Sequence, residues 1–153
     1  MPPGADQEEL LRQFPDPRTL LHKYDLWPRK SLGQNFLVDP GAPARIADCA
    51  DLSPEDTVLE VGAGLGTLTA ELALRAGRVI AVETDPQLAG VLEVELGTVD
   101  CIHLVHGDML TLDPAVLLGE DTGRNGLRGG DTGSSDLRGE DTGSSGLRGE
   151  DTG

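Results

Sequence analysis

The chain has 153 residues and a formal net charge of −15, from 27 acidic and 12 basic side chains. This acidic balance argues against strong binding to nucleic acid, because phosphate contacts need a basic surface. The sequence has no apolar run long enough to span a membrane and no basic-then-apolar leader, and its two cysteines form no spacing motif. We therefore expect a soluble cytoplasmic protein with reduced cysteines and one folded domain.

Short helices are predicted before the first strand. Asp16–Pro17 and Asp39–Pro40 each pair an N-cap residue with a proline suited to the first helical position. The first helix would place Leu20, Leu21 and Tyr24 on one face. The second would carry Ile46 and Ala47 toward the sheet. We expect residues 1–30 to form a helical extension, or flap.

All four aromatic residues lie within the first 36 residues: Phe14, Tyr24, Trp27 and Phe36. They favour a flap packed over the sheet, with Phe36 and Leu37 beside the loop described next. Stacking on nucleic-acid bases is the alternative use of such side chains.

A glycine-rich loop follows the first predicted strand. Val58–Val61 is mostly apolar, and Gly62, Gly64 and Gly66 come directly after it, before an apolar helical pattern that ends near Gly77. Glycine lets the backbone turn sharply and lets a ligand approach closely. The start of the helix offers unpaired N–H groups to a polar or anionic ligand. The pattern predicts a strand, a nucleotide-cofactor loop and a helix.

Two further strands are predicted, and each leads to an acid. Arg78–Glu83 reads as a buried strand whose last residue lies 17 positions beyond Gly66, near the offset at which an acid meets ribose hydroxyls in such folds. Asp85–Pro86 opens the next helix, which has its apolar stripe at Leu88, Val91, Leu92 and Leu96. Ile102–His106 is the third strand and runs into Asp108. The predicted fold is therefore α/β, with about three parallel strands and acids at their carboxyl edge.

The loop pattern separates two cofactor classes. A dinucleotide fingerprint, G-x-G-x-x-G, would require a third glycine at position 67, which is Thr67. The segment from Glu60 reads E-x-G-x-G-x-G instead. It resembles the first motif of S-adenosylmethionine-dependent methyltransferases, so an NAD-binding Rossmann fragment is the weaker alternative.

A second segment makes the resemblance more specific. Residues 31–39 read SLGQNFLVD, and together with residues 60–69 they resemble the N-terminal half of the ribosomal RNA adenine N6-dimethyltransferases of the kasugamycin- and erythromycin-resistance type. The similarity covers roughly residues 20–116. It implies a Rossmann-like fold, S-adenosyl-L-methionine as cofactor and, for full-length relatives, small-subunit rRNA as partner. The cofactor-binding residues that it implies here are Asn35, Leu37, Gly62, Glu83 and Asp108.

Several of these residues have a second interpretation. Glu83 could be a solvated strand end, and Asp108 could serve ordinary turn chemistry. Glu60 could orient loop amides or contact the ligand. Cys101, His103, His106 and Asp108 raise the question of a metal, but strand alternation puts 101 and 103 on one face and 106 on the other. We expect no metal site.

The resemblance stops before the family's catalytic motif. No Asn-x-Pro-aromatic or Asp-x-Pro-aromatic sequence follows Asp108, so this N-L-P-Y-type motif is absent and no catalytic residue is assigned. We expect a truncated Rossmann-like half-domain over residues 31–116, inactive alone, monomeric or aggregation-prone, and at best weak in binding RNA. A non-catalytic S-adenosylmethionine-binding module is the alternative.

The remaining residues, 117–153, repeat a ten-residue unit of the type LRGEDTGSSG. They contain eleven of the 21 glycines and no aromatic residue, so they lack the apolar surface that would offset the entropy of ordering them. We expect a disordered tail. Calcium-binding glycine–aspartate repeats differ in having a nine-residue period.

Overall fold

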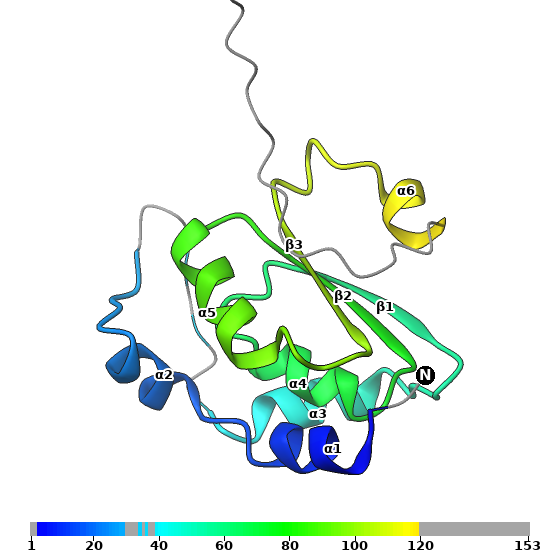
Figure 1. The fold of residues 1–153 in the computed structure, drawn as a ribbon, viewed down its shortest axis with the longest axis horizontal. Coiled ribbons are helices and arrows are strands. Elements are labelled where there is room, and N and C mark those ends of the chain that lie inside the picture. Colours follow the sequence, from blue (N-terminus) through cyan, green and yellow to red (C-terminus); the bar gives the residue numbers. More distant parts are fainter. Residues whose placement is uncertain (1–2, 30–33, 35, 37–38, 120–153) are drawn as a thin grey trace, which may run out of the picture.

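The computed structural model describes residues 3–29, 34, 36 and 39–119. In this part of the chain, three parallel strands form one sheet in the order β1 (Thr57–Val61), β2 (Arg78–Glu83) and β3 (Ile102–His106) (Figure 1). The prediction of three parallel strands is confirmed. The disordered tail predicted for residues 117–153 needs correction at its start, because residues 117–119 form the end of a helix, α6 (Pro114–Gly119); residues 120–153 lie outside the described residues.

The register of the strands brings their carboxyl ends to one edge. Val61 of β1 pairs with Val82 of β2, and Glu83 of β2 pairs with His106 of β3. The residues that follow the three strands are therefore neighbours in space, as expected where an open α/β sheet binds its ligand.

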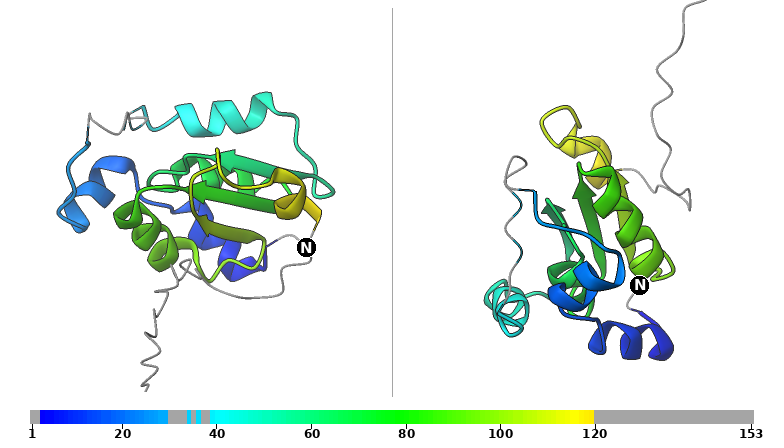
Figure 2. Two further views of the ribbon diagram at one scale, coloured as in Figure 1. Left: turned by 90° about the horizontal axis from the view of Figure 1, so that it is seen from above. Right: turned by 90° about the vertical axis from the view of Figure 1, so that its left-hand side faces the viewer.

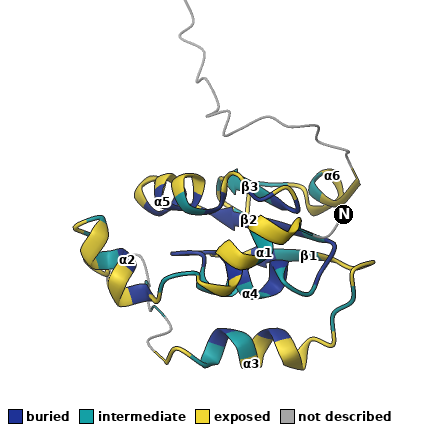
Figure 3. Ribbon diagram, turned by 60° about the horizontal axis from the view of Figure 1, so that its bottom comes forward, coloured by how far each residue is buried: buried dark blue, intermediate teal, exposed yellow. Residues whose placement is uncertain are grey.

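Two crossover helices cover the same face of the sheet. They are α4 (Thr67–Ala73), between β1 and β2, and α5 (Pro86–Leu96), between β2 and β3. Right-handed crossovers in a sheet whose strands follow in order require this arrangement. In agreement, Val79 and Ala81 of β2 lie in one apolar cluster with Ala73 of α4 and Leu92 of α5. Strand β2 is buried from Val79 to Glu83 (Figure 3).

Helix α5 begins as predicted. An Asp85 carboxylate oxygen accepts a hydrogen bond from the Gln87 N–H at 2.9 Å, and Pro86 occupies the first turn. The four predicted core residues of α5 are all buried: Leu88, Val91, Leu92 and Leu96.

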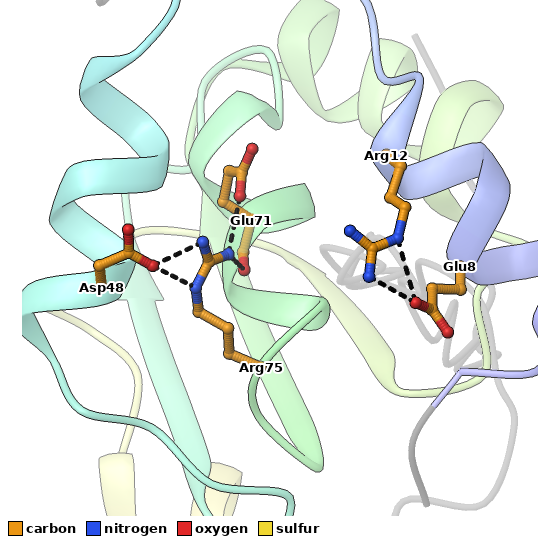
Figure 4. Close-up of polar contacts among 5 residues, drawn as sticks. All are labelled: Glu8, Arg12, Asp48, Glu71 and Arg75. Carbon is orange, nitrogen blue, oxygen red and sulfur yellow. Dashed lines mark hydrogen bonds and ion pairs between the residues drawn. The ribbon is translucent and has the colours of Figure 1, made fainter.

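The remaining described helices are α1 (Ala5–Arg12), α2 (Pro17–Lys23), α3 (Ala42–Cys49) and α6 (Pro114–Gly119). Helices α1 and α3 each pack against α4, and Figure 2 shows that α3 (cyan) and α1 (dark blue) lie apart from each other. Arg75, which follows α4, ties α3 to α4: its guanidinium lies 2.7 Å from Asp48 and 2.7 Å from Glu71 (Figure 4). Within α1, Arg12 and Glu8 form an exposed pair in the same view.

Two N-terminal predictions need correction. The second helix does not open at Asp39–Pro40: Asp39 accepts a hydrogen bond from the Gly41 N–H in a preceding turn, and α3 starts at Ala42. Ala47 of α3 is buried as predicted, but Ile46 is 44% exposed. A helix that packs on another helix through one narrow stripe buries only one of two consecutive residues.

Gly77 is not the cap of α4, which ends at Ala73. A Cβ at Gly77 would lie 1.9 Å from the carbonyl oxygen of Pro54. This glycine is therefore required by the close passage of the segment before β1, a contact between residues far apart in sequence.

Candidate cofactor site

The loop of residues 62–66 joins β1 to α4. Its three glycines all have positive φ, 78° at Gly62, 62° at Gly64 and 85° at Gly66, which other L residues rarely adopt. A Cβ on Gly66 would lie 2.8 Å from Leu92 and from Leu96, so this glycine lets the loop pack on α5. Gly62 is exposed, and a Cβ there would meet nothing within 4 Å. The backbone at Gly62 is thus the part of the loop that a ligand can approach.

Glu83 links this loop to the end of β2. One oxygen of its carboxylate accepts a hydrogen bond from the Gly64 N–H at 2.7 Å, and the other accepts one from the Asp85 N–H at 2.8 Å. The side chain is only 6% exposed. A carboxylate offers about four acceptor positions, so two remain for the hydroxyls of a ligand. The group therefore fits the role of a ribose acceptor.

Backbone hydrogen bonds fix the strand ends beside Glu83. The carbonyl of Val82 accepts from the N–H groups of Gly62 and Ala63, at 2.8 and 3.1 Å, and the carbonyl of Glu83 accepts from the Gly107 N–H at 2.9 Å. The structure thus brings Gly62 and Glu83 together at the same edge, next to the segment that carries Asp108.

Asp108 lies in a turn after β3. Its carboxylate accepts a hydrogen bond from the Leu110 N–H at 2.9 Å, and its carbonyl accepts one from the Thr111 N–H at 2.9 Å. These hydrogen bonds correspond to the second interpretation of Asp108, in which it stabilises a turn. The side chain is exposed, and its carboxylate has acceptor positions beyond the one used in the turn.

Glu60 does not orient the loop amides, a role that Glu83 fills. Glu60 is 8% exposed and accepts a hydrogen bond from the Thr69 hydroxyl of α4 at 2.6 Å. Burial raises the pKa of its carboxyl to about 7; the Thr69 hydrogen bond opposes this rise, and the nearby Glu83 charge adds to it. Glu60 is therefore a buried carboxyl behind the loop.

The N-terminal segment covers the loop. The Phe36 ring lies 3.6 Å from the position that a Cβ on Gly64 would occupy, and Phe36 packs in an apolar cluster with Leu20, Leu65 and Leu88. Its predicted place beside the loop is confirmed. Asn35 and Leu37 lie outside the described residues, so their cofactor contacts stay a prediction.

The other aromatic side chains divide into two groups. Phe14 and Tyr24 pack against apolar clusters, as the flap interpretation predicts. Trp27 does not: it is 81% exposed.

The structure adds two residues that sequence reasoning did not select. The side-chain amide of Gln34 donates a hydrogen bond to the Asp85 carboxylate at 2.6 Å, and Asp85 is 4% exposed. Gln34 belongs to the Gly-Gln-Asn-Phe-Leu segment that carried the resemblance, which was the available signal. For Asp85 the sequence predicts only the N-cap of α5.

In the described ranges no group of three or more His, Cys, Asp or Glu side chains is placed to hold a metal ion. Of the helices described, none has the length and apolar character that a membrane span would need.

Residues 27–125, about two thirds of the chain, match the family model of the Ribosomal RNA adenine dimethylase family. The chain belongs to this family. Ribosomal RNA small subunit methyltransferase A of Moorella thermoacetica is 50% identical to it over 109 residues, which cover 69% of this chain and 38% of that relative. The protein of the same description from Dehalococcoides mccartyi is 45% identical over 104 residues, covering 68% and 36%.

The chain thus spans little more than a third of the length of these dimethylase relatives. Among solved structures, 23S rRNA methyltransferase ErmE has 48% sequence identity, covers 52% of this chain and 33% of its own, and superposes with a TM-score of 0.49.

Proposed function

We propose that this dimethylase-family chain binds S-adenosyl-L-methionine at the carboxyl edge of its sheet, with Gly62 and Glu83 at the nucleoside. The observation that carries the proposal is the hydrogen bond from Gly64 to Glu83, which sets a carboxylate against an open glycine turn. The cofactor's sulfonium supplies the methyl group in such enzymes. The chain's own residues bind and orient the nucleoside.

Each proposed contact has a physical basis. The exposed backbone at Gly62 allows close approach. Glu83 has acceptor positions for the two ribose hydroxyls, and Asp108 presents an exposed carboxylate beside the adjoining strand end for the adenine amino group. Asn35 and Leu37 complete the set by family resemblance.

The proposed parent reaction is dimethylation of adenine in rRNA, the activity in the family's description, at N6 by the family resemblance. For this polypeptide the proposal assigns cofactor binding and not methyl transfer, because no N-L-P-Y-type motif follows Asp108. The net charge of −15 supports weak RNA binding at most. We expect no methyl incorporation into small-subunit rRNA by the 153-residue chain, and turnover would contradict this assignment.

Titration of the isotope-labelled chain with S-adenosylmethionine, and separately with NAD, tests cofactor binding. We expect saturable shifts of the amides of residues 62–66 with S-adenosylmethionine alone. Glu83→Gln should weaken binding by about ten- to a hundredfold, because a hydrogen bond to a charged group contributes about 1.5–3 kcal/mol. Glu55→Gln, at an exposed site before β1, is the matched control and should bind like the parent. Saturation by NAD without a response to S-adenosylmethionine would refute the proposal.

A further inference from the structure

A line of hydrogen bonds connects the N-terminal segment to the glycine loop. The Gln34 side-chain amide donates to one Asp85 carboxylate oxygen at 2.6 Å. The Asp85 backbone N–H donates to Glu83 at 2.8 Å, and the other Glu83 oxygen accepts from the Gly64 N–H at 2.7 Å. Three chain segments that are distant in sequence, around Gln34, Gly64 and Glu83–Asp85, are therefore connected through the two carboxylates of Asp85 and Glu83.

Asp85 has little freedom to move within this line. It is 4% exposed, and its second carboxylate oxygen caps α5 by accepting from the Gln87 N–H at 2.9 Å. The Arg29 guanidinium lies 3.9 Å from the first oxygen. Because a buried carboxylate must have its acceptor positions filled, the hydrogen bond from Gln34 fixes the orientation of Asp85 and of its backbone N–H.

Gln34 is itself held on both sides. Its side-chain oxygen accepts from the Arg29 N–H at 2.9 Å, and Phe36, two residues later, packs against Gly64 and the apolar cluster of Leu65. The same short segment thus contacts the loop directly through Phe36 and indirectly through Asp85 and Glu83.

We propose that Gln34 and Asp85 are positioning residues for Glu83. They hold its carboxylate in the orientation that accepts the hydrogen bond from the Gly64 N–H and presents the free acceptor positions to the ribose. The proposal deepens the cofactor-binding function and rests on it. Packing of Gln34 and Phe36 beside the loop is then coupled to the orientation of the Glu83 carboxylate. Loss of the Gln34 side chain leaves Asp85 underpartnered and lets Glu83 turn away from the loop.

The first test needs no ligand. In the full 153-residue chain, Gln34→Ala should shift the Gly64 amide resonance upfield, because its hydrogen bond to Glu83 weakens even though Gln34 does not touch Gly64. Gln7→Ala is the matched control: it removes a glutamine that bonds to Thr98 and Asp100 instead, and should leave the Gly64 amide in place. An unmoved Gly64 amide in folded Gln34→Ala would overturn the proposal.

The second test separates positioning from a general structural effect. Gln34→Ala should raise the Kd for S-adenosylmethionine about three- to tenfold in the parent, and should have no further effect when Glu83→Gln is already present. Equal losses in both backgrounds would overturn the coupling. Asp85→Asn keeps an oxygen for the α5 cap, and combined with Gln34→Glu it reverses donor and acceptor, so the pair should restore binding that each single change weakens. Failure of the unmodified chain to bind S-adenosylmethionine would refute the proposed function, while the ligand-free Gly64 amide would still decide the positioning role.

Discussion

Glu60 is a buried carboxyl of the described part of the chain whose charge state should affect folding stability. Burial raises the pKa of its carboxyl from the usual 4.5 to about 7 in the folded chain. Between these two values the folded state holds a proton that the unfolded state has lost. The free energy of unfolding contributed by Glu60 should therefore fall as pH rises from about 4.5 to about 7, by about 3 kcal/mol, and stay level above that range.

Glu60→Gln should remove this pH dependence, because the amide is neutral throughout and can still accept the Thr69 hydroxyl. Urea unfolding of both chains at pH 5, 6, 7 and 8 measures the difference between them. The variant should gain stability relative to the parent as pH rises. Glu55→Gln, at an exposed carboxylate before β1, is the control for a simple charge change. A constant difference between parent and Glu60→Gln across the range would show that Glu60 titrates normally.

At the scale of elements, α2 is followed by a residue, Asp25, whose left-handed backbone conformation is unfavourable for a residue other than glycine. Asp25 has φ 51°, and the helix closes with the Leu26 N–H donating to the Leu21 carbonyl at 2.9 Å, the pattern of a Schellman motif. Glycine is favoured at this left-handed position. Asp25→Gly should therefore stabilise the chain by about 1 kcal/mol, measured as a higher urea midpoint with unchanged slope. Asp48→Gly, inside α3, should instead destabilise the chain by about 1 kcal/mol or more, because glycine is disfavoured within a helix and the ion pair with Arg75 is lost. An unchanged or lower urea midpoint in Asp25→Gly would contradict the inference that the positive φ of Asp25 destabilises the folded chain.

The elements that the sequence predicted are those whose signals are local. Asp16–Pro17 and Asp85–Pro86 act within one helical turn, so the starts of α2 and α5 could be read directly. The role of Gly77 could not be predicted in this way, because the Pro54 carbonyl that excludes a side chain there belongs to an earlier part of the chain. For Glu83, the residue and its place at the strand end were predictable from spacing. Its bond to Gly64 depends on strand register, and so do the contributions of Asp85 and Gln34.

For the whole molecule, the question is whether the N-terminal flap folds separately from the sheet. Division of the chain at residue 30 and the half-domain over 31–116 remain proposals. Two apolar clusters bear on them: one joins the sheet to α4 and α5, and the other joins Leu20 of α2 to Leu65 and Leu88. Phe14 packs against both, and Leu11 of α1 is buried in the first. Because the clusters share a side chain, we propose that the flap and the sheet unfold as one unit.

Leu20→Ala tests this unity. Leu20 is fully buried, and its truncation should cost about 3 kcal/mol through lost burial and the cavity that remains. If folding is cooperative, amide hydrogen exchange in the central strand, Val79–Val82, should accelerate by about a hundredfold although Leu20 does not touch β2, since those amides exchange by global unfolding. Leu10→Ala, at a leucine that is 40% exposed, is the matched control and should change exchange in β2 little. Faster exchange in α2 with β2 unaffected would instead identify the flap as a separately unfolding segment, and cofactor affinity would then depend on how often that segment is seated.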